Sequence, residues 1–204
     1  MTLSESWASY VSLLTDRAPR TAAAIRAPRS AEARQKADFS KVPWNGDLRE
    51  FFSLHDGQPQ RTTAEADAGT VLPQLWLLGI DEVVEAHSRC RQTHFYTDHL
   101  GTDWPQVAGA EPASVVVSMF RDAYVPFAST GDGNYLCVDT GPGEHHGCVR
   151  EFGLEFAVWR DLPVMQAAFA LMEALTGVRV TLDLLRESTY LSLDIPLPTE
   201  PAVN

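Results

Sequence analysis

GDGNYLCVDTGPG, residues 131–143, has the composition of a short strand between two tight turns. Tyr135–Val138 favours β-structure, and glycine-rich segments lie on both sides of it. Gly131–Asn134 supplies residues that tolerate the positive φ angles of a tight hairpin. A second β-favouring run, Cys148–Phe152, follows the turn at Asp139–Gly143. The stretch therefore predicts two antiparallel strands in succession.

Further segments extend this sheet and surround it with helices. Other β-favouring runs are Val115–Val117, Tyr124–Ala128 and Leu154–Trp159. Apolar residues at helical spacing, each with a capping residue, predict helices that begin at Thr2, Asp47, Asp81 and Asp161. Gly57 is placed to end the second helix. Helices followed by a strand meander and a last helix predict an α+β fold, a single domain in which helices flank an antiparallel β-sheet.

Two upstream segments add a family resemblance. VPWNGDLREFFSLHDGQ, residues 42–58, and LPQLWLLGIDEVVEA, residues 72–86, precede the GDGNYLCVD block. In this order the segments resemble those of the SUKH superfamily. This superfamily contains Smi/Knr-like proteins, named after a fungal regulator of cell-wall synthesis, and it includes bacterial immunity proteins. The resemblance covers about residues 7–180. It implies a SUKH-like α+β domain in a family that is mostly not enzymatic.

We expect three regions along the chain. Residues 1–41 form an N-terminal helix and an Ala/Arg-rich connector, which Pro19 and Pro28 divide into short helices or flexible segments. Residues 42–180 form the SUKH-like domain. Residues 181–204 form a C-terminal extension, in which three prolines disfavour regular structure.

Charge and composition narrow the classes of partner. The net charge is −11, and the first 41 residues carry seven basic and four acidic side chains, so the acidic excess lies in the remainder. An acidic body repels phosphate backbones, which disfavours direct nucleic-acid binding and favours a basic protein partner. No apolar run reaches the roughly 18 residues that indicate a membrane span. Three cysteines without a Cys-x-x-Cys pair predict reduced thiols and a cytoplasmic location.

Candidates for chemistry are weak. His87, Cys90 and His94 share one helical face, but their spacing matches no compact zinc signature. Cys137 and Cys148 lie within predicted strands, a poor position for an exposed nucleophile. The glycine pairs at 131–133 and 141–143 lead into strands rather than into a helix, so they predict turns and not a phosphate loop. We therefore expect no catalytic residue, no metal and no cofactor.

The remaining candidates combine aromatic side chains with polar hairpin residues, a composition suited to protein contacts. These partner-binding candidates are Trp76, Trp104, Asp132, Asn134, Asp139, Glu144, His145 and His146. The alternative for Trp76 and Trp104 is that they belong to the hydrophobic core rather than to a binding surface.

The leading hypothesis is a non-catalytic protein-binding module. The resemblance implies an immunity protein that neutralises a polymorphic toxin by covering its active site, and the acidity suits a basic toxin domain such as a nuclease. A regulatory scaffold is the alternative within the family. A small metal- or thiol-dependent enzyme is the second alternative, supported by the scattered His and Cys residues.

Overall fold

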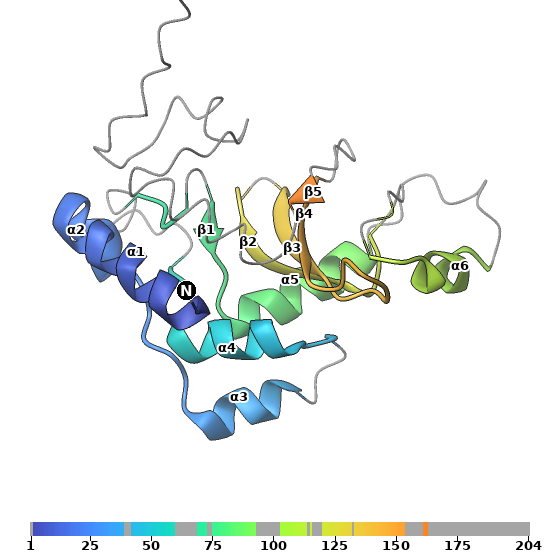
Figure 1. Ribbon diagram of the computed structural model, residues 1–204, viewed down its shortest axis with the longest axis horizontal. Helices are drawn as coiled ribbons and strands as arrows, with labels where there is room; N and C mark the ends of the chain where they lie inside the picture. The colour runs from blue at the N-terminus through green and yellow to red at the C-terminus, as the bar shows by residue number, and fades with distance from the viewer. Residues whose placement is uncertain are drawn as a thin grey trace, which may run out of the picture.

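The computed structural model describes residues 2–38, 42–59, 69–72, 75–92, 103–113, 115, 120–131, 133–153 and 161–162. Within these residues one antiparallel sheet runs in the order β1-β2-β3-β4-β5, and helices pack around it (Figure 1). The strands are β1 (Trp76–Leu77), β2 (Tyr124–Ser129), β3 (Tyr135–Asp139), β4 (Cys148–Phe152) and β5 (Asp161–Leu162). The α+β class and the antiparallel sheet are confirmed, and the β2–β3 turn lies where the GDGN sequence predicts it.

The helices are α1 (Leu3–Arg17), α2 (Pro19–Ala23), α3 (Ala31–Asp38), α4 (Gly46–Leu54), α5 (Ile80–Gln92) and α6 (Trp104–Ala110). Thr2 and Glu5 form the predicted capping box of α1. The Ala/Arg-rich segment contains two short helices, α2 and α3. Its sequence had left open whether it forms short helices or flexible segments.

Helix α1 contributes to the same hydrophobic core as the sheet. Trp7, Tyr10 and Leu14 are buried in one cluster with the side chains of α4, β2 and β3. The rings of Trp7 and Phe51 meet edge to face at 5.9 Å, and Phe51 meets Phe127 of β2 at the same distance. The core is therefore continuous from the N-terminal helix to the sheet.

Four predicted element boundaries were wrong. Asn45 caps α4 through its Oδ1, which accepts from the Leu48 N–H at 2.9 Å, and the helix ends at Leu54 rather than at Gly57. The first N–H of α5 is capped by Asp56 and not by Asp81. Asp161 belongs to β5, where it pairs with Arg150, and does not begin a helix. Asn45 directly precedes α4, and Asp56 reaches α5 only through the tertiary structure. Rules based on the spacing of capping residues do not anticipate either cap.

Some predicted segments lie outside the described residues. They include the Leu154–Trp159 run and the helix expected after Leu162. Val115 is described and is not in a strand, whereas the two valines that follow it are not described.

The segment His55–Gln58 joins four parts of the chain through buried polar groups. Asp56 accepts from the Ile80 N–H at 2.9 Å through Oδ1 and from Arg29 Nε at 2.7 Å through Oδ2. Its backbone pairs with Arg26, whose N–H also donates to the Gly57 carbonyl at 2.8 Å. The linker before α3 is thereby held against the start of α5.

Gln58 and Gly57 complete this connection. The buried Gln58 side chain accepts from the Val71 N–H at 2.8 Å and donates to the Gly69 carbonyl at 3.1 Å. Gly57 has φ +72°, and a Cβ built on it would lie 2.4 Å from the backbone of Leu78 and Gly79. Only glycine fits here, because both the φ angle and the contact exclude a side chain.

The Gly57→Ala substitution is therefore expected to lower the free energy of unfolding by more than about 3 kcal/mol, since backbone must move to admit the methyl group. Gly46→Ala is the matched control: a Cβ there meets nothing within 4 Å, and the position is helical. Alanine should be neutral or stabilising by about 0.5–1 kcal/mol at that site. Urea unfolding measures both, and equal effects would contradict the close approach at Gly57.

His55 gives the fold a dependence on pH. Its ring is fully buried, 4.6 Å from the Trp7 ring and 4.1 Å from the Phe51 ring, and its Nδ1 accepts from the Gly57 N–H at 2.8 Å. Burial, with a smaller effect of the Arg26 charge, lowers the pKa of His55 to about 3. The unfolded chain takes up a proton near pH 6.5 that the folded protein resists, so stability is full above that pH and falls as the pH drops toward 3.

We expect His55→Asn to make the free energy of unfolding less dependent on pH between about 6.5 and 4, because asparagine does not titrate there. Its carbonyl can accept from the N–H two residues ahead, as Nδ1 does. The variant should also be about 2 kcal/mol less stable at neutral pH, since the ring contacts are lost. Denaturant unfolding at several pH values tests this, and an unchanged pH dependence would contradict the assignment.

Candidate functional site

The turn between β3 and β4 is held by buried hydrogen bonds. The Gly141 N–H donates to Asp139 Oδ1 at 2.9 Å, and the Gly147 N–H donates to the Asp139 carbonyl at 2.7 Å. The Ala113 N–H donates to the Pro142 carbonyl at 2.7 Å, which ties the turn to the segment after α6. The turn thus has one fixed conformation on the end of a buried sheet.

Arg121 connects the turn to α6. Its side chain is fully buried, with Nη1 3.8 Å from Asp139 Oδ2, and its guanidinium lies 5.4 Å from the centre of the Tyr124 ring. The same guanidinium donates to the carbonyl groups of Pro112, at 3.1 Å, and Glu111. A buried cation needs such acceptors, and here they hold the end of α6 beside the β3–β4 turn.

Polar side chains gather on the outside of this turn. Glu144, His145 and His146 are exposed. Asp47, at the start of α4, lies beside the turn: its Oδ2 is 3.6 Å from the position that a Cβ on Gly147 would occupy. We call the set Asp47, Glu144, His145 and His146 the β3–β4 turn surface.

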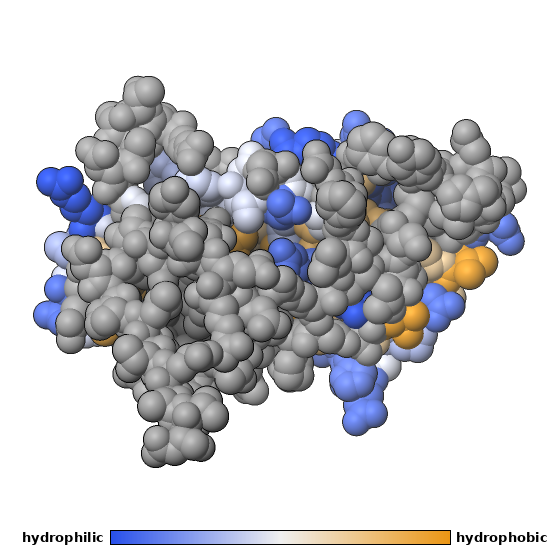
Figure 2. All heavy atoms as spheres, turned by 90° about the horizontal axis from the view of Figure 1, so that it is seen from above, coloured by the Kyte–Doolittle hydropathy of each residue, from blue (hydrophilic) through white to orange (hydrophobic). Residues whose placement is uncertain are grey.

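Helix α6 adds an apolar group near this surface. Val107 is 56% exposed, which is unusual for a large apolar side chain in the described part of the chain. Figure 2 shows apolar and polar side chains exposed together at the end of the molecule where α6 lies. An apolar group with polar groups around it fits the apolar core and polar rim of a protein interface.

The other predicted binding residues lie elsewhere. Trp76 and Asn134 flank the β2–β3 turn, at the opposite end of β3. The five residues of β3 separate the two turns by roughly 17 Å. Trp76 is half-buried and packs beside Gly131, 3.3 Å from the position of its missing Cβ. The partner-binding candidates therefore fall into two groups, one at each end of β3.

Asp139 requires a correction. We expected its carboxylate on the binding surface, but its side chain is fully buried and is committed to Gly141 and Arg121. Its role is to fix the turn. Asp132 and the side chain of Trp104 lie outside the described residues, although Trp104 begins α6, the helix beside the β3–β4 turn.

The candidates for metal binding and thiol chemistry that the structure describes are core residues, whereas His94 lies outside the described residues. His87 Nε2 is 2.9 Å from the Asp122 carbonyl oxygen, and burial lowers the pKa of this imidazole. Burial raises the pKa of the Cys90 thiol to about 12 and that of Cys137 well above its usual value, which opposes the thiolate form. Among the described residues no three His, Cys, Asp or Glu side chains are grouped to hold a metal ion.

Comparison with known families identifies the chain. Residues 41–165 match the SMI1 / KNR4 family (SUKH-1). The protein belongs to this family. The resemblance to the SUKH superfamily is thus confirmed, and it places the chain in a generally non-catalytic family.

Other comparisons add less. Residues 152–199 match a family of unknown function (DUF6461), and a comparison with curated proteins found no match. In the part of the chain that the structure describes, every helix is too short or too polar to cross a membrane.

Within this SUKH-1 domain, sequence reasoning missed one member of the turn surface. Asp47 was assigned to helix capping, but its carboxylate lies beside Gly147 of the β3–β4 turn. No local pattern signals this proximity, because the two residues are far apart in the chain.

The chemistry of the cysteines can be tested directly. We expect Cys90 and Cys137 to resist alkylation by iodoacetamide in the native protein at about pH 8 and to react after denaturation, because buried neutral thiols are poor nucleophiles. Mass spectrometry locates the labelled cysteines. Elemental analysis of the purified protein should show no stoichiometric zinc. Rapid native alkylation of Cys137, or one zinc per chain lost on His87→Ala, would reinstate the enzyme hypothesis.

Proposed function

We propose that this SUKH-1 protein is a non-catalytic protein-binding module that acts as an immunity protein, neutralising a polymorphic toxin by covering its active site or substrate groove. The observation that carries the proposal is the β3–β4 turn surface, with its exposed acidic and imidazole groups on a rigid buried support. Membership of a generally non-catalytic family supports the binding role. The location is proposed to be the cytoplasm, where such a toxin would act on its own cell.

Rigidity favours this use of the turn. Asp139 and Arg121 fix the turn from inside the fold, so its exposed groups lose little conformational entropy when a partner binds. Substitution of an exposed side chain of the turn should therefore change binding and leave the buried hydrogen bonds of Asp139 and Arg121 intact. A turn built in this way is suited to recognition rather than to a moving lid.

Charge suggests the type of partner. The chain carries a net charge of −11, and Asp47 and Glu144 add acidic groups to one surface. Complementary charge accelerates the encounter with a basic protein, such as a toxin with nuclease activity. Occlusion needs no catalysis. This agrees with the burial of the three cysteine thiols and with the packing of the His87 imidazole against Phe120.

Neutralisation is tested by expressing this chain with a toxin domain encoded next to its gene. Immunity predicts that the chain restores growth and forms a stoichiometric complex with the toxin. Binding without restored growth would favour the regulatory scaffold instead. Absence of both with every neighbouring toxin domain would contradict the immunity role.

Glu144→Lys tests the surface itself. We expect slower association with the basic partner at low salt and a nearly unchanged unfolding midpoint, because Glu144 is exposed. Stopped-flow or surface-binding kinetics at several salt concentrations measure the rate, and the difference should shrink as salt increases.

Glu85→Lys is the matched control for charge. Glu85 has a side chain that is 77% exposed and lies on α5, in the hollow between α3 and α5. The Glu85→Lys substitution changes the net charge by the same amount as Glu144→Lys, but at a position away from the turn. An association rate that both variants lower equally would show a general charge effect and would remove Glu144 from the interface.

A further inference from the structure

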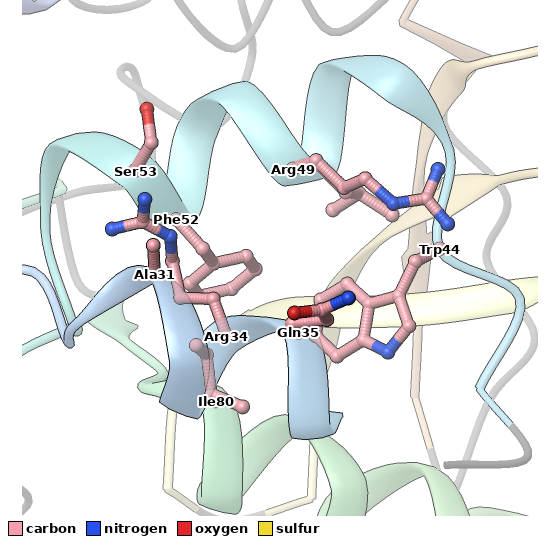
Figure 3. A pocket seen from close by; sticks show the side chains of 9 residues that line it. Ala31, Arg34, Gln35, Trp44, Arg49, Phe52, Ser53 and Ile80 are labelled. Atoms are coloured by element: carbon pink, nitrogen blue, oxygen red, sulfur yellow. The ribbon is translucent and has the colours of Figure 1, made fainter. Parts of the chain in front are cut away.

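A pocket of about 240 Å³ lies between α3 and α4, above the start of α5. Trp44, Phe52 and Ile80 supply its apolar wall, and Arg34, Gln35 and Arg49 supply its polar groups. Figure 3 shows the guanidinium groups of Arg34 and Arg49 toward opposite sides of this α3–α4 pocket, with the Phe52 ring between them. Among the described residues that line it, none is acidic.

The apolar wall is built by the core. Phe52 and Ile80 are buried, and the Trp44 ring meets the Phe52 ring edge to face at 5.4 Å. These side chains are fixed by packing on α4 and α5, so the pocket exists before any ligand binds. Preformed apolar walls with a few polar groups are the usual composition of small-molecule sites.

Arg34 is the unusual residue. It is half-buried, and among the described residues its guanidinium makes one hydrogen bond, from Nη1 to the Arg29 carbonyl at 2.7 Å. Other arginines of the described chain pair with carboxylates at 2.6–3.8 Å: Arg26, Arg29, Arg89, Arg91 and Arg121. In an acidic protein, a half-buried arginine with no described carboxylate partner has donors available for an anion.

The neighbouring hollow gives the contrast. On the other side of α3, between α3 and α5, basic residues also line a depression. Asp81 and Glu85 lie in the same lining and pair there with Arg29 and Arg89. Arg29 and Arg89 are thus paired with carboxylates in that hollow, whereas the described residues that line the α3–α4 pocket include no carboxylate.

We propose that the α3–α4 pocket binds a small organic acid, whose carboxylate pairs with Arg34 in the field of Arg49 and whose short apolar group lies against Trp44 and Phe52. The volume corresponds to roughly eight water molecules, which suits a small acid and excludes a nucleotide. This site is separate from the β3–β4 turn surface, so it stands or fails independently of the immunity role.

The probe is phenylacetate, with its neutral counterpart phenylacetamide and inorganic phosphate as comparisons. The readout is the indole N–H resonance of Trp44 in the labelled full chain, assigned with Trp44→Phe. We expect saturable movement with phenylacetate, and at least fivefold weaker binding of the amide and of phosphate. Equal binding of all three, or no saturable movement with phenylacetate, would overturn the proposal.

Arg34→Gln should weaken phenylacetate binding roughly tenfold, because a hydrogen-bonded charge pair is lost. Arg20→Gln is the matched control, an exposed arginine of α2 outside the pocket, and should bind as the unaltered protein does. An equal affinity of the Arg34 and Arg20 variants would overturn the proposal.

Ala31→Phe tests the pocket without altering charge. Ala31 is exposed and lines the pocket, so a phenyl ring there should fill the space and abolish binding while the fold remains. This variant decides the question if Arg34→Gln fails to fold. Undiminished phenylacetate binding by the Ala31 variant would place the ligand elsewhere and contradict the site.

Discussion

The buried carboxylate of Asp56 is the interaction on which the rest of the structure depends. It caps the first N–H of α5 and binds Arg29, while the backbone around it pairs with Arg26. One short segment therefore fixes the end of α4, the linker before α3 and the start of α5. A buried carboxylate is costly unless it is fully hydrogen-bonded, so this arrangement also excludes other ways of joining the three segments.

A second buried charge organises the opposite end of the sheet. Arg121 and Asp139 connect the segment after α6 to the β3–β4 turn, in the same way that Asp56 connects the helices. The sheet between them is apolar and buried along β2 and β3. Apolar packing stabilises the centre of the molecule, and the two polar clusters determine how the connecting segments are placed on it.

The fold also separates side chains that are used for packing from side chains that are accessible for binding. Reactive side chains such as Cys137 and His87 are used within the core, where burial opposes their ionisation. The groups proposed to meet a partner lie on the turn that Arg121 and Asp139 hold, and those proposed to bind a small anion lie in the pocket between α3 and α4. Binding rather than catalysis is the chemistry that this distribution supports, in agreement with a SUKH-1 protein.

The sequence by itself determined strands β2, β3 and β4, the fold class and the family. Glycine turns on both sides of Tyr135–Val138 and the alternation of strand and turn are local features, and they required no knowledge of distant contacts. The same holds for the capping box of α1. Tertiary structure decided which polar residues are exposed: Asp139 and Glu144 look alike in a hairpin sequence, but Arg121 draws the first into the core. It also placed Trp76 and Glu144 near opposite ends of β3, and brought Arg34 and Trp44 into the lining of one pocket. Such placements depend on contacts between segments distant in the chain.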